Sequence, residues 1–74
     1  MSVQEVLKGF IKEKGIKHKF IADRLGFNDN AFSQIINGKR RLTADDLIDI
    51  LLIIGVDPNE FVNKALQERK KDNE

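Results

Sequence analysis

The chain has 74 residues, a formal net charge of +1 and no cysteine. A length of this order fits one domain, and the absence of cysteine excludes disulfides and thiolate metal sites. His18 is the single histidine, so it cannot build a metal cluster, and we expect neither a metal nor another cofactor.

No apolar run approaches the roughly 20 residues that span a bilayer. The N-terminus also lacks the basic region and long apolar core that are typical of a signal peptide. We therefore expect a cytoplasmic protein that makes no contact with a membrane.

Five helices and no strand are predicted, beginning with two helices before Gly26. Ser2 and Glu5 form a capping box, after which apolar residues keep helical spacing on one face until Gly15 ends the helix. The second helix is predicted over residues 17–25 and ends at Gly26, since glycine readily adopts the left-handed conformation that closes a helix.

A third helix follows, and together with the second it carries a distinctive pattern over residues 18–37. Asn28 is a good N-cap for this helix, which reaches Asn37 before Gly38. The pattern combines apolar residues at regular spacing with a small residue at the expected helix crossing and a glycine at the turn: Ile21, Leu25, Phe27, Phe32 and Ile35, then Ala22, then Gly26. It predicts a helix-turn-helix, whose second helix enters the DNA major groove.

The fourth and fifth helices complete the predicted domain. The fourth begins after the N-cap Thr43 and reaches Ile54. The fifth has Pro58 at its first position, where proline is favoured. These signals predict an all-α domain over residues 1–67, followed by a charged tail over residues 68–74 that frays.

The fourth helix is apolar on more than one face. One interpretation places it at the centre of the domain, where both faces are buried. A domain of this size has little interior, however, and exposed apolar clusters mark partner surfaces. We therefore expect a homodimer interface built from the fourth and fifth helices, with four candidate residues: Leu52, Ile53, Val56 and Phe61.

Charge is unevenly distributed along the chain. Between Lys8 and Arg41 there are nine Lys or Arg residues against three Asp or Glu. Between Leu42 and Glu60 there are five acidic residues and no basic one. The domain should therefore have a basic side that attracts a phosphate backbone, although clustered surface charge also occurs without a function.

Over residues 6–62 the chain resembles the Cro/phage-repressor (Xre-type) helix-turn-helix family. The resemblance rests on IADRLGFNDNAFSQIINGKRR, residues 21–41, and on IGVDPNEF, residues 54–61. It implies a compact five-helix, lambda-repressor-like DNA-binding domain, and a bacterial or phage regulator that binds a palindromic double-stranded DNA operator as a dimer. The chain departs from the family at Ile36, where many members have an acidic residue, and in a first helix without a common arginine.

The exposed side of the third helix is the candidate base-reading face. Its core side should hold Phe32 and Ile35, and the opposite side then presents short polar residues: Asp29, Asn30, Ser33, Gln34 and Asn37. The amides of Asn30 and Gln34 can make bidentate hydrogen bonds to adenine, and a carboxylate can accept from a cytosine amino group. The alternative is a helix face that is merely soluble.

Phosphate contacts are expected on both sides of this face. His18 stands where the family often has a glutamine that bonds the DNA backbone, and a protonated ring would make binding sensitive to pH. An exposed histidine without a role is the alternative. The candidates lie at the start of the second helix, at the cap of the third and in a basic loop: Lys17, His18, Lys19, Asn28, Lys39, Arg40 and Arg41.

These observations favour a sequence-specific transcriptional regulator, most simply a small phage- or plasmid-type repressor. The alternative is an antitoxin or partner-binding module on the same fold, whose fourth and fifth helices bind another protein. Enzymatic activity is not expected, because the sequence offers no nucleophile–base pair and no glycine-rich phosphate loop after a strand.

Overall fold

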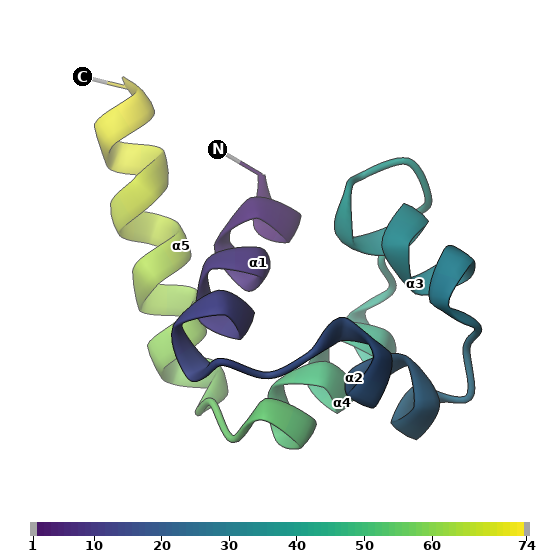
Figure 1. Ribbon diagram of the computed structural model, residues 1–74. Helices are drawn as coiled ribbons and strands as arrows, with labels where there is room; N and C mark the ends of the chain where they lie inside the picture. Colours follow the sequence, from purple (N-terminus) through teal and green to yellow (C-terminus); the bar gives the residue numbers. More distant parts are fainter. Residues whose placement is uncertain (1, 74) are drawn as a thin grey trace.

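The computed structural model describes residues 2–73, and the side chains of residues 2–70. This range forms five helices and contains no strand (Figure 1): α1 Val3–Lys14, α2 His18–Leu25, α3 Asp29–Ile36, α4 Ala44–Ile54 and α5 Pro58–Asn73. The predicted all-α, five-helix domain is confirmed. None of these helices is long and apolar enough to cross a membrane.

Local hydrogen bonds fix where three of the helices begin. The side-chain oxygens of Ser2, Asn28 and Thr43 accept the backbone N–H three residues later, over 3.2, 2.7 and 3.1 Å. Each bond satisfies one of the donors that a helix N-terminus leaves without an intrahelical partner. All three caps agree with the starts predicted from sequence.

The fifth helix extends further than its sequence pattern indicates. The backbone is helical from Pro58 to Asn73, so most of the predicted tail from residue 68 continues α5. Lys64 and Glu68 form an ion pair over 3.3 Å along this helix. The prediction relied on the loss of apolar residues, whereas the straight-chain polar residues at this end have good helix propensity.

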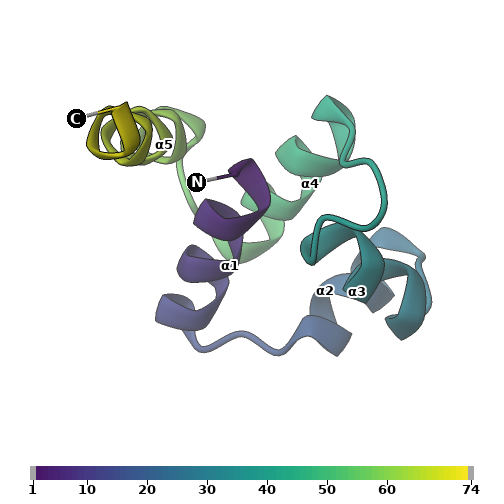
Figure 2. The same ribbon diagram turned by 90° about the horizontal axis from the view of Figure 1, so that it is seen from above.

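The hydrophobic core draws on every helix. The Phe10 and Phe61 rings, from α1 and α5, lie 5.9 Å apart between centroids. These two helices lie next to each other in Figure 1, and in both ribbon views α2 and α3 lie on the other side of the molecule from α5 (Figures 1 and 2). The buried apolar residues are as follows: Val6, Leu7, Phe10, Ile11, Ile21, Ala22, Phe32, Ile35, Ile36, Ile50, Leu51, Ile54, Val56 and Phe61.

Two of the four residues expected at a dimer surface belong to this core. Val56 and Phe61 are each only 3% exposed, since both belong to the apolar cluster, where Phe61 packs on Phe10 of α1. Their expected place on an exposed surface is therefore wrong. Leu52 is 70% exposed and Ile53 is half-buried, so these two remain accessible.

Candidate nucleic-acid interface

A tight turn joins α2 to α3. Gly26 adopts φ of 79°, a left-handed conformation that residues with a Cβ rarely take. The next N–H, that of Phe27, donates to the carbonyl of Ala22 over 2.9 Å and so closes the end of α2. Ala22 itself is completely buried, in agreement with a small residue at the helix crossing. The sequence predicts this helix-turn-helix geometry correctly.

The third helix separates an apolar side from a polar side. Phe32, Ile35 and Ile36 are buried, and they anchor α3 to the rest of the domain. The five candidate base-reading residues are all exposed along the same short helix and its C-cap: Asp29, Asn30, Ser33, Gln34 and Asn37. The structure therefore leaves a polar helix surface open to a ligand.

One candidate on this surface already has partners within the protein. The Asn37 side chain accepts a hydrogen bond from the Lys8 ammonium over 2.7 Å, and its Nδ2 donates to Oγ of Ser33 over 3.2 Å. Sequence analysis missed this connection because Lys8 lies 29 residues away on α1. It joins a cation of the first helix to the end of α3.

The candidate phosphate-binding residues at the start of α2 are exposed beside α3. The His18 ring meets the edge of Phe32, with the two centroids 5.5 Å apart and the planes at 76°. His18 and Lys19 line a small hollow together with Asp29 and Ser33 of α3. The start of α2 and the polar side of α3 therefore share one surface, as a nucleic-acid interface requires.

The basic loop after α3 is held against that helix. Gly38 takes φ of 79°, which turns the chain back. The backbone N–H groups of Lys39 and Arg40 both donate to the carbonyl of Gln34, over 2.9 and 3.1 Å. These bonds place exposed cations directly after the polar surface of α3.

The departure from the family at Ile36 is accommodated by the core. Ile36 is 2% exposed and belongs to the same apolar cluster as Ile11 of α1, which is 1% exposed. An apolar side chain therefore fills a position at which many members of the resembled family have an acid. The change strengthens the attachment of α3 to α1 through burial of apolar surface.

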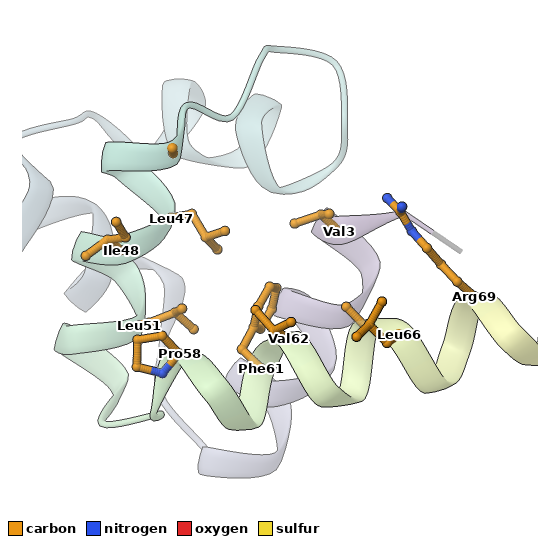
Figure 3. Close-up of a pocket in the computed structure, with 11 residues that line it drawn as sticks. Val3, Leu47, Ile48, Leu51, Pro58, Phe61, Val62, Leu66 and Arg69 are labelled. Carbon is orange, nitrogen blue, oxygen red and sulfur yellow. The ribbon is translucent and has the colours of Figure 1, made fainter.

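A second surface feature lies away from α3, where α4 and α5 diverge. Leu47 and Leu51 of α4 converge with Val62 and Leu66 of α5 on Val3 of α1 (Figure 3). We call this hollow the α4–α5 groove. Ile48, Val62 and Leu66 of this groove are exposed. The apolar faces of the fourth helix predicted an exposed surface on these two helices, but none of these three residues was among the four candidates.

Comparison with known proteins agrees with this geometry. A family model described as a helix-turn-helix domain matches residues 5–67, which is most of the chain and includes both α2 and α3. Neither the curated proteins nor the solved structures provide a significant match. The family match is consistent with the Xre-type resemblance seen in the sequence, and the chain belongs to the helix-turn-helix domain family.

Proposed function

We propose that the protein is a sequence-specific transcriptional regulator that reads double-stranded DNA with α3. The observation that carries this proposal is the exposed pair Asn30 and Gln34, one helical turn apart on a helix that a helix-turn-helix presents to the major groove. Side-chain amides make bidentate hydrogen bonds to adenine. Asp29 and Ser33 complete the reading surface at the N-terminal half of the helix.

Cations on both sides of α3 support the same proposal. Lys17, His18 and Lys19 are exposed at one end of the surface, and the basic loop of residues 39–41 is exposed at the other. Asn28 caps α3 through its side chain, which leaves its backbone N–H for a phosphate. Such contacts position a protein on the duplex without reading its sequence.

Substitution of the two amides tests the reading surface. Asn30→Ala and Gln34→Ala should each lower discrimination against the wrong base by about 1–3 kcal/mol, while nonspecific binding persists. Competition titrations with a preferred duplex and its single-base variants measure this loss. Gln67→Ala removes the same group from exposed α5 and should change nothing. Unaltered base preference in both α3 variants would contradict the assignment.

We further propose that the protein acts as a homodimeric repressor on a palindromic operator, in the cytoplasm of a bacterium. The α4–α5 groove supports a dimer, because exposed apolar surface favours association and α5 lies at the opposite side of the molecule from α3 (Figures 1 and 2). Two copies joined there would keep both α3 helices uncovered. We propose a phage or plasmid origin on the resemblance to the Cro/phage-repressor family alone. We assign the chain no catalytic activity.

A charge in the groove tests the dimer. Leu66→Glu should shift the protein to a monomer in sedimentation equilibrium, because a carboxylate is costly to bury against Val62 and Leu51. Gln67→Glu adds the same charge to the neighbouring residue outside the groove and should leave the mass unchanged. A wild-type monomer at all concentrations would reject dimerisation through this surface.

The second candidate function is a protein-binding module, such as an antitoxin, on the same fold. The apolar α4–α5 groove is the observation that favours it, since a partner helix can occupy such a hollow. A stoichiometric partner that copurifies with the wild type and is lost from Leu66→Glu would support this function. A stable homodimer with tight operator binding would count against it.

A further inference from the structure

A chain of hydrogen bonds links α1 to the polar surface of α3. The Lys8 ammonium donates to Oδ1 of Asn37 over 2.7 Å, and Nδ2 of Asn37 donates to Oγ of Ser33 over 3.2 Å. Asn37 is the C-cap of α3, and Ser33 lies one turn earlier on the surface proposed to read bases. A cation at a helix C-terminus is also favoured by the helix dipole.

The chemistry of Lys8 determines which group donates in each of these two hydrogen bonds. An ammonium has donors and no acceptor, so it must face the amide oxygen of Asn37. The amide nitrogen, which only donates, then faces Ser33, whose oxygen accepts. A serine hydroxyl has a single hydrogen. In this arrangement that hydrogen is not used toward Asn37 and remains available to a ligand.

We infer that Lys8 and Asn37 are positioning residues that keep the hydroxyl hydrogen of Ser33 available as a donor toward DNA and so allow Ser33 to bond guanine or thymine. This inference rests on the proposed function, since it concerns a base contact of α3. Guanine, adenine and thymine offer acceptors in the major groove, whereas cytosine presents an amino donor there. While Asn37 leaves its hydrogen free, Ser33 can bond guanine or thymine at the base position that it faces, and its second lone pair can still accept from cytosine.

The substitution Asn37→Asp reverses the direction of the hydrogen bond between residue 37 and Ser33. A carboxylate accepts from both neighbours, so it keeps the bond to Lys8 and takes the single hydrogen of Ser33. The hydroxyl then presents only lone pairs to DNA. Selection from a random duplex pool should show that, at one base position, guanine and thymine fall about fivefold relative to cytosine in Asn37→Asp compared with wild type, the worth of one hydrogen bond.

Four further variants separate this effect from charge and from folding. Asn63→Asp makes the same change on exposed α5 and should leave the selected sequence intact. Adding Ser33→Ala to Asn37→Asp should abolish the preference for cytosine at the affected position alone. Lys8→Met frees the Asn37 amide to rotate and should shift that position in the same direction as Asn37→Asp, whereas Lys8→Arg keeps a donor and should behave as wild type. Circular dichroism at the selection temperature establishes that each variant is folded.

The base at one position is the deciding readout, because a merely structural role of Asn37 would lower affinity for all sequences alike. A selected sequence that is identical for Asn37→Asp and wild type, or altered at every position, would overturn the inference while leaving the proposed function in place. A wild-type protein that selects no sequence would reject both. In that case NMR decides whether the hydrogen-bond network itself exists. The side-chain amide proton resonances of Asn37 must then shift in Lys8→Met and in Ser33→Ala.

Discussion

Two backbone hydrogen bonds hold the basic loop, Lys39, Arg40 and Arg41, against α3. The carbonyl of Gln34 accepts from both Lys39 and Arg40, so the basic loop cannot swing away from α3 without breaking them. A mobile loop would pay a larger ordering cost on binding a phosphate backbone. The two bonds instead hold the backbone of Lys39 and Arg40 beside the polar surface of α3.

Removal of one loop cation should change the salt dependence of DNA binding. Arg40→Ala or Arg41→Ala is expected to lower the slope of log affinity against log salt by about one unit for each lost phosphate contact. The decrease in affinity should be similar for preferred and random duplexes, since phosphates carry no sequence information. Binding titrations at several salt concentrations measure the slope, with Lys70→Ala on α5 as the control. An unchanged slope in both loop variants would remove the loop from the interface.

At the scale of the helices, glycines show how local backbone geometry shapes the helix-turn-helix. Gly26 has φ of +79° at the end of α2, whereas Gly9 lies within α1. An added Cβ would meet no atom within 4 Å at either position. The two sites therefore differ in backbone conformation and not in available space.

Alanine at these two glycines should have opposite effects on stability. Gly26→Ala is expected to lower the free energy of unfolding by roughly 1–2 kcal/mol, the cost of a left-handed conformation for a residue with a Cβ. Gly9→Ala should raise it by roughly 0.5–1 kcal/mol, because glycine loses more conformational entropy in a helix. Urea denaturation of both variants provides the comparison. Effects of the same sign would show that φ does not govern the difference.

Helix starts were predictable from sequence because their causes are local. Ser2, Asn28 and Thr43 each bond an N–H three residues away, so a short sequence window contains both partners. The length of α5 was harder to predict, since the residues after Gln67 have good helix propensity but no apolar periodicity, and no glycine stops the helix. The Lys8 bond to Asn37 could not be predicted, because it depends on how α1 packs against α3.

At the scale of the whole molecule, burial decides which apolar residues are structural. The burial of Phe61 depends on its contact with Phe10, some fifty residues earlier, and no local pattern contains that information. Leu52, in contrast, is 70% exposed although its sequence surroundings are equally apolar. Sequence periodicity thus identified the apolar faces of α4. Which of them is covered depends on tertiary packing, above all on α2, which packs against α4.

Two leucines of opposite exposure test this division. Leu7→Ala should lower the free energy of unfolding by about 2–5 kcal/mol, because the Leu7 side chain is completely buried and its removal leaves a cavity. A core of this size rarely supplies more than about 3–5 kcal/mol, so this variant should be largely unfolded at 25 °C. Leu52→Ala should change stability by no more than about 0.5 kcal/mol. Thermal melts of both variants distinguish them, and similar losses would contradict the assigned core.

The central claim is that the exposed surface of α3, with cations on both sides, reads a DNA sequence. The most direct test is selection of duplexes from a random pool by the purified wild-type protein at physiological salt. We expect a palindrome whose half-sites lie about one helical turn apart, as a dimeric helix-turn-helix requires. Recovery of no common sequence, or of duplexes bound equally well regardless of sequence, would contradict the claim.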